Sequence, residues 1–116
     1  MTAAQDLAYV SSHLIPDTTV WVAEINGVIA GYVAYRLDWI DHLYIHPDRQ
    51  GQGIGPVLLA KAMEGGEPRQ LWAFQQNARA RRFYEARGFR AVEFTDGAGN
   101  EEKTPDVRYE WRPPNL

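Results

Sequence analysis

Three glycines stand close together in the sequence, directly before a run of apolar residues. Gly51, Gly53 and Gly55 belong to the stretch RQGQGIG, and the apolar run continues from 57 to 63. A helix N-terminus carries N–H groups without an intrahelical partner and the positive end of the helix dipole. Glycines before it expose further N–H groups and let a bulky anion approach the backbone. The spacing therefore indicates a phosphate-binding turn, although the same residues also suit an ordinary strand-to-helix connector.

The glycine pattern differs from two common nucleotide-binding loops. No Gly-Lys-Ser/Thr triplet follows it, and the spacing G-x-G-x-G lacks the third glycine of the dinucleotide fingerprint at its place. A nucleotide-binding domain that uses this turn is therefore the least favoured function hypothesis.

A second group of residues with chemical potential follows, with Asn77 standing 22 positions after Gly55. Asn is a common helix cap, and a glycine such as Gly88 often closes a helix. Phe83 and Tyr84 lie between them on the predicted helix, and a phenol can donate a proton to a leaving group. Taken alone, these two rings would more often be read as core packing.

Composition and length limit the classes of protein. With 116 residues and 45% apolar content, residues 1–116 are predicted to form a single globular domain. The chain has no cysteine, which excludes disulfides and thiolate chemistry and permits a cytoplasmic location. The N-terminus lacks a signal-peptide pattern, and no apolar run approaches the roughly 20 residues of a membrane span.

The formal net charge of −3 is unevenly distributed. Residues 49–90 contain eight basic and three acidic residues, a local balance of +5, and the remainder carries −8. A basic middle section favours an anionic partner there, although a solvated charged face is an equally good reading. The acidic remainder argues against a nucleic-acid surface, which needs extended contacts to phosphates.

The elements that would position these residues begin with a predicted helix over 3–14, ended by Pro16. Two β-branched and aromatic runs then flank Asn26-Gly27, which predicts a tight hairpin. The stretch WIDHLYIHP predicts a third strand, and Pro47 stops it because proline has no N–H donor. These three strands predict an antiparallel meander.

The second half alternates between helix and strand patterns. A helix over about 55–63, with Pro56 in its first turn, is followed by the strand QLWAF, which predicts a parallel βαβ unit. NARARRFYEAR predicts a helix, and FRAVEFT and VRYEWR predict a hairpin with a long loop. The fold class is therefore α+β, a mixed sheet of about six strands with three to four helices.

Both motifs resemble those of the GCN5-related N-acetyltransferase (GNAT) superfamily. The family's pyrophosphate motif, Q/R-x-x-G-x-G/A, is matched by Gln50, Gly53 and Gly55. Its second signature, N-x-x-A-x-x-F-Y-x-x-x-G-F, is matched at every spacing from Asn77 to Phe89. The resemblance covers roughly 20–111 and implies the GNAT-like acyl-CoA N-acyltransferase fold.

The resemblance implies acetyl-CoA as cosubstrate and assigns residues to it. Backbone N–H groups of the glycine turn would hold the pyrophosphate, namely those of Gln50, Gly51, Gln52, Gly53, Ile54 and Gly55. The strand before the turn would pair with the pantetheine arm through the backbone of Leu43, Tyr44 and Ile45. Asn77 and Phe83 would lie beside the cofactor, and Tyr84 would be the general acid for the leaving thiolate. Arg49, Arg79, Arg81 and Arg82 are candidates for contacts with phosphates.

The implied reaction is direct transfer of acetyl to a primary amine in a ternary complex. The oxyanion would accept a hydrogen bond from the backbone of Leu43 or Ile45. The base would be Asp41 or His42, with a water chain as competitor. Strand alternation predicts that Asp41 shares a face with Leu43 and that His42 shares the other with Tyr44. No His/Asp/Glu cluster has metal-ligand spacing, so no metal is expected.

The sequence departs from the family before residue 20. Only about 17 residues precede the matching region, so the first strand is expected to be missing and the domain N-terminally shortened. The acceptor, a small amine or a protein or peptide amine, is not identified, and an unpaired strand edge favours a possible homodimer. The alternative to an enzyme is a non-catalytic acyl-CoA-binding or regulatory module.

Overall fold

The computed structural model describes residues 9–15 and 17–113. The chain divides into two compact units, the first ending at Gly65 and the second beginning at Gly66. Each unit has its own strands and its own α-helix.

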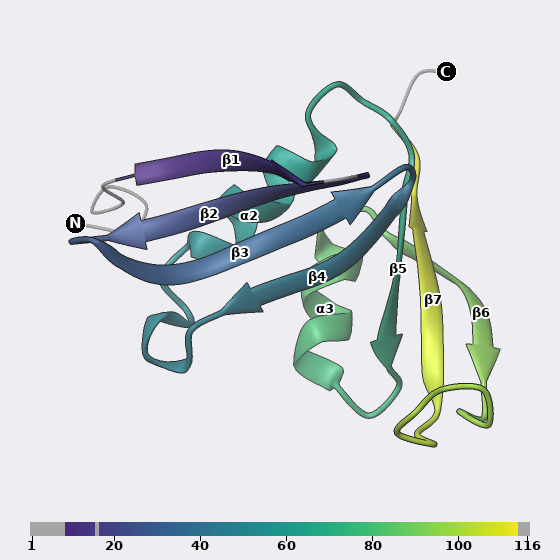
Figure 1. Cartoon of the computed structure of the whole chain (residues 1–116). Helices are drawn as coiled ribbons and strands as arrows, with labels where there is room; N and C mark the ends of the chain where they lie inside the picture. Colours follow the sequence, from purple (N-terminus) through teal and green to yellow (C-terminus); the bar gives the residue numbers. More distant parts are fainter. Residues whose placement is uncertain (1–8, 16, 114–116) are drawn as a thin grey trace. The chain divides into compact units, whose positions relative to one another are not determined.

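The first unit is an antiparallel meander of four strands, with a helix that packs on it (Figure 1). Each strand pairs with the next along the chain. The strands are β1 (Tyr9–Ile15), β2 (Thr18–Ile25), β3 (Val28–Arg36) and β4 (Trp39–Ile45). A short 3-10 helix, η1 (Pro47–Arg49), and the helix α2 (Ile54–Met63) follow β4.

The predicted hairpin is confirmed at Asn26-Gly27. Both residues have positive φ angles, 54° and 78°, which is the backbone that a two-residue hairpin turn requires. Asparagine and glycine adopt this region at lower cost than other residues. The turn therefore sets the register between β2 and β3.

A strand lies where the sequence predicts a helix. β1 is antiparallel to β2, from Tyr9 opposite Glu24 to Ile15 opposite Thr18, so the predicted helix is wrong for residues 9–14. Residues 3–8 lie outside the described part of the chain. The apolar spacing in this segment fits a helix, but pairing with β2 supplies a full ladder of backbone hydrogen bonds that local spacing cannot reveal. A strand therefore precedes β2, where the first strand was expected to be missing.

The helix α2 buries one face against β2, β3 and β4. Its fully buried residues lie three and four positions apart, as expected for one side of a helix. They are Ile54, Leu58, Leu59 and Ala62, each at most 1% exposed. Burial of one such leucine contributes about 1.5–3 kcal/mol to stability, so this face holds α2 and the turn before it in place.

The second unit consists of β5 (Arg69–Phe74), α3 (Ala78–Ala86), β6 (Arg90–Thr95) and β7 (Asp106–Trp111). β7 lies between β5 and β6 and is antiparallel to both, which confirms the predicted C-terminal hairpin. Val107 and Tyr109 are fully buried, whereas Arg108 and Glu110 remain partly exposed. This alternation is typical of a strand with one buried face.

The buried phenol of Tyr109 ties α3 to β7. It donates to Glu85 Oε2 at 2.5 Å and accepts from Arg81 Nε at 3.0 Å. Arg81 and Glu85 lie one helical turn apart and form an ion pair at 3.8 Å. Gly88, with φ of 90°, closes the helix as predicted. These contacts fix the orientation of α3 on its sheet.

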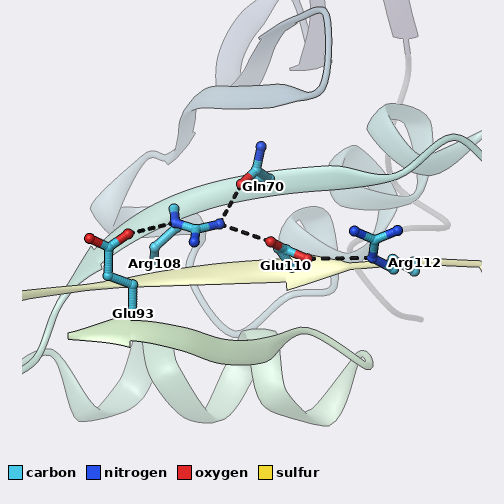
Figure 2. A network of polar contacts seen from close by, with 5 residues as sticks. All are labelled: Gln70, Glu93, Arg108, Glu110 and Arg112. Atoms are coloured by element: carbon cyan, nitrogen blue, oxygen red, sulfur yellow. Dashed lines mark hydrogen bonds and ion pairs between the residues drawn. The ribbon is translucent and has the colours of Figure 1, made fainter.

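Arg108 organises polar side chains from all three strands of the second unit (Figure 2). Its guanidinium donates to Glu93 Oε1 at 2.9 Å and Glu110 Oε2 at 2.9 Å, and to Gln70 Oε1 at 2.5 Å. Arg112 adds a longer contact to Glu110 at 3.4 Å. The hydrogen bond from Arg108 lowers the pKa of the Glu110 carboxyl below its usual range. The positive charge of Arg108 is therefore offset by two carboxylates.

The α+β fold class is confirmed. The described residues contain seven strands, where about six are predicted, and two α-helices with one 3-10 helix, where three to four helices are predicted. Neither described α-helix has the length and apolar character that a membrane-spanning helix requires.

Candidate functional site

The glycine turn leads directly into α2, and two of its glycines have left-handed backbones. Gly51 has φ of 77° and Gly53 has φ of 86°. Gly53 is the N-cap of α2, so this cap offers no side-chain oxygen to the first N–H groups of the helix. The first turn of α2 also has no acidic residue. The N-terminal backbone of α2 is therefore suited to an anion supplied by a ligand.

His46 fixes the entry to this turn, a role that the sequence reading did not assign. Its backbone N–H donates to Ala30 O at 2.7 Å, which extends the β3–β4 ladder, and its Nδ1 accepts from the N–H of Asp48 at 3.1 Å. His46 is thus the N-cap of η1, where the chain leaves the sheet. A histidine directly before Pro47 is the sequence signal that could have indicated this cap.

The backbone of β4 presents alternate N–H groups to its two edges. In an antiparallel ladder every second residue bonds to a given neighbour. Because His46 donates to β3, the residues at odd positions, Leu43 and Ile45, direct their N–H groups away from β3. These are the two N–H groups that the sequence reading proposes as oxyanion donors.

Gly31 on β3 permits the close approach of β4. A Cβ at this position would lie 2.5 Å from the carbonyl oxygen of Tyr44, which is shorter than any real contact of that kind. A glycine inside a strand often marks such an approach. The neighbouring pair, Tyr32 and Tyr44, brings two rings together at 5.6 Å on one face of the sheet.

The two candidate bases lie at an irregularity of β4. His42 pairs with Ala34 and Ile40 pairs with Tyr35, so Asp41 is an extra residue that forms a β-bulge. The simple alternation expected to align Asp41 with Leu43 therefore does not continue across this position. Asp41 Oδ2 accepts from Arg36 Nε at 2.9 Å, and His42 is exposed.

In the second unit, Asn77 caps α3 as predicted. Its Oδ1 accepts from the N–H of Ala80 at 3.1 Å. This bond uses only the acceptor of the side-chain amide, so the two Nδ2 hydrogens take no part in it. Asn77 therefore combines a structural acceptor with donors that a ligand could use.

Tyr84 is held among aromatic rings. Its ring centroid lies 5.3 Å from that of Phe83, 5.6 Å from Phe89 and 6.1 Å from Tyr109. Burial raises the pKa of Tyr84 to about 12. The phenol therefore keeps its proton at neutral pH.

The arginines of the middle section have different surroundings. Arg81 is committed to Tyr109 and Glu85, and the guanidinium of Arg87 lies 4.0 Å from the ring centroid of Phe83. Arg82 is exposed on α3. Of the four arginines considered for phosphate contacts, Arg81 thus has a structural role within its own unit.

The candidate residues fall into two groups. β4 and the glycine turn place Asp41 to Gly55 within the first unit, and α3 places Asn77, Phe83 and Tyr84 within the second. Among residues 9–15 and 17–113, no group of three His, Cys, Asp or Glu side chains could hold a metal ion.

Known proteins share this sequence pattern and fold. Residues 16–91 match the family described as Acetyltransferase (GNAT) domain. An uncharacterized N-acetyltransferase of Archaeoglobus fulgidus is 37% identical over 98 residues, which cover 71% of this chain and 66% of that protein. The crystal structure of a nourseothricin acetyltransferase has a TM-score of 0.75 at 22% identity, covering 85% of this chain and 67% of that one.

A third similar structure contains acetyl coenzyme A. The putative streptothricin acetyltransferase of Bacillus anthracis, in complex with acetyl coenzyme A, has a TM-score of 0.73 at 20% identity, covering 84% of this chain and 64% of that chain. The chain spans 41% to 66% of the length of the first two curated relatives that it matches. Because the family match extends over residues 16–91, more than half of the sequence, the chain belongs to the GNAT acetyltransferase family.

Proposed function

We propose that this protein is an acetyl-CoA-dependent N-acetyltransferase that transfers acetyl directly to a primary amine in a ternary complex. The observation that carries the proposal is the N-terminus of α2, where Gly53 caps the helix without a side-chain acceptor and with a left-handed backbone. This geometry fits a pyrophosphate, which supplies the acceptor oxygens that the cap lacks. Acetyl-CoA, when bound, supplies the thioester that makes acyl transfer favourable.

In the first unit, the backbone is proposed to do most of the binding. The N–H groups from Gln50 to Gly55 hold the pyrophosphate, and the backbone of Leu43, Tyr44 and Ile45 lies along the pantetheine arm. The N–H groups of Leu43 and Ile45, which are directed away from β3, are proposed to stabilise the developing oxyanion. Fixed backbone donors of this kind need no rearrangement as charge develops.

In the second unit, α3 is proposed to bring the polar groups. Asn77 donates from its Nδ2 to the cofactor while its Oδ1 caps the helix. Phe83 contributes an apolar contact to the cofactor. Tyr84 would donate its phenolic proton to the departing thiolate, and its raised pKa means that the phenol is protonated before the transfer.

The amine must lose a proton before or during attack. Asp41 or His42 is proposed as the base, with a water chain as the competing route. Asp41 is paired with Arg36, whereas His42 is exposed on the same strand. If His42 acts, His42→Gln lowers turnover, whereas Asp41→Asn leaves it almost unchanged. If Asp41 acts, Asp41→Asn lowers turnover at all pH values.

The acceptor is proposed to be a small amine or an amine of a protein or peptide. The test is a screen of small amines, peptides and aminoglycosides with acetyl-CoA, followed by mass spectrometry. Transfer to an amine supports the proposal, and binding of CoA without any transfer contradicts it.

The alternative is a non-catalytic module that binds acyl-CoA. It is favoured by the ion pair of Asp41 with Arg36, which occupies one of the two candidate bases. Calorimetry with CoA and the acetylation screen separate the two functions.

A homodimer is also proposed, and sedimentation velocity at several protein concentrations tests it.

A further inference from the structure

The second unit has a pocket whose lining residues include none of the candidate catalytic or cofactor-binding residues. Its volume is about 540 Å³, within the range of roughly 300–1,000 Å³ that small-molecule sites occupy. It is lined by Trp72, Ala73, Phe74, Thr95, Gly99, Asn100, Glu102 and Asp106. The loop between β6 and β7 lies at the same end of this unit as the C-terminal end of β5 (Figure 1).

One wall of the pocket is aromatic. Trp72 and Phe74 are two positions apart on β5, so both rings project from the same face of the strand. Trp72 is 44% exposed, which is unusual for a large ring on a sheet and leaves its surface available for contact. Aromatic faces attract cations through the negative charge of their ring faces.

A second wall carries negative charge. Glu102 and Asp106 line the pocket, and the lining contains no lysine or arginine. Arg108 lies opposite Trp72 in the β5–β7 register, but its guanidinium is bonded to Glu93 and Glu110 (Figure 2). The positive charge of Arg108 is therefore offset by these two carboxylates, and the acidic lining of the pocket favours a positively charged ligand.

The loop that forms this wall is held by its own hydrogen bonds. Asn100 Nδ2 donates to Thr104 O at 2.7 Å and to Asp106 Oδ2 at 3.2 Å. Thr95 Oγ1 donates to the other oxygen of Asp106 and accepts from the N–H of Gly97. Because these contacts exist within the described loop itself, a ligand need not order the loop to bind.

We propose that this pocket binds an organic ammonium ion whose apolar body lies against Trp72 and Phe74 and whose charge faces Glu102. The inference deepens the proposed function, on which its biological meaning rests, by naming a cationic amine with an apolar body as the preferred ligand class. Binding to the pocket is nevertheless measurable without acetyl-CoA and without turnover.

The probe is 2-phenylethylammonium, with neutral 2-phenylethanol as the uncharged comparison. The chain has four tryptophans, so their indole N–H signals in an NMR titration are few, and Trp72→Phe assigns the one of interest. We expect the Trp72 signal to shift on titration with the ammonium while that of Trp21, in the first unit, does not. Equal binding of the alcohol would show that the charge is not recognised and would overturn the proposal.

Glu102→Gln removes the proposed charge contact, and Glu101→Gln is the matched control. Both glutamates are exposed and adjacent in the loop, but only Glu102 lines the pocket. We expect Glu102→Gln to weaken ammonium binding about fivefold, since an exposed ion pair contributes up to about 1 kcal/mol. Glu101→Gln should change it less than twofold. Equal effects of the two substitutions would contradict the assignment of Glu102.

Failure of the pocket and failure of the proposed function give different results. If the pocket assignment is wrong, the Trp72 signal is unmoved while acetyl transfer to some amine is still found in the screen. If the proposed function is wrong, no amine is acetylated, and the pocket titration is unaffected because it contains no acetyl-CoA.

Discussion

At the scale of single residues, Tyr84 places a phenol, which can donate a proton, among three other aromatic rings. Phe83, Phe89 and Tyr109 surround its ring, and burial raises its pKa to about 12. When the pKa of a group is higher in the folded state than in the unfolded state, its contribution to stability is complete below the unfolded-state pKa. That contribution is lost as the pH rises to the folded-state pKa. For Tyr84, the protein should therefore lose stability between pH 10 and about 12.

Tyr84→Phe is expected to lower turnover by about 100-fold, as is typical when a general acid is removed, and to leave CoA affinity almost unchanged. The phenyl ring keeps the aromatic packing, so the fold should persist. Steady-state kinetics and calorimetry measure the two effects. In urea unfolding between pH 10 and 12, wild type should lose stability relative to this variant. Turnover at the wild-type rate across pH would rule out the general-acid role.

Asn77 can be tested with a matched pair of substitutions. Asn77→Ala removes both the cap to Ala80 and the Nδ2 donors, whereas Asn77→Asp keeps a capping oxygen and replaces the donors with a carboxylate oxygen and its negative charge. We expect both variants to bind CoA more weakly, but only the alanine variant to lose about 1 kcal/mol of stability. Urea unfolding and calorimetry provide the measurements. Unchanged CoA affinity in Asn77→Asp would restrict Asn77 to capping.

At the scale of elements, the glycine turn and α2 are proposed to act together in binding the cofactor. Gly53 and Gly65 have nearly the same left-handed backbone, with φ of 86° and 90°, and stand just before and just after α2. An alanine at either position carries a similar conformational cost of about 1–2 kcal/mol. Only the turn at Gly53 is proposed to contact a phosphate.

Gly53→Ala should therefore weaken CoA binding about tenfold or more, whereas Gly65→Ala should destabilise the protein to a similar extent without weakening binding. Calorimetry with CoA and urea unfolding of both variants distinguish a binding effect from general strain. Retained CoA affinity in Gly53→Ala would contradict the assignment of the glycine turn.

The elements also show which features local sequence can predict. The hairpin at Asn26-Gly27, the cap at Asn77 and the closing Gly88 each depend on a few neighbouring residues, and all were predicted correctly. β1 was not, because its apolar spacing suits a helix and its strand form depends on pairing with β2. The bulge at Asp41 depends on the pairing of β4 with β3, and the pocket beside Trp72 depends on segments distant in sequence. The roles proposed for Tyr84, Asp41 and His42 stay predictions.

At the scale of the whole molecule, binding of CoA should raise the stability of the folded chain. A ligand that binds only the folded state adds about 2.7 kcal/mol at one hundred times its Kd. We therefore expect a clear increase of Tm with CoA, and no comparable increase with AMP or GTP at equal concentration. Differential scanning fluorimetry measures both. Equal stabilisation by a mononucleotide would instead favour a nucleotide-binding domain.

The loop between β6 and β7 has a further consequence for altering the protein. A Cβ at buried Gly97 would lie 2.2 Å from the carbonyl carbon of Thr104, so this position accepts only glycine. Asn100 holds the C-terminal part of the loop through Thr104 and Asp106, while Ala98, Glu101 and Glu102 stay exposed. The loop's shape and its surface chemistry are thus encoded by different residues. A library that varies only the three exposed positions could redirect ligand choice while keeping the scaffold intact.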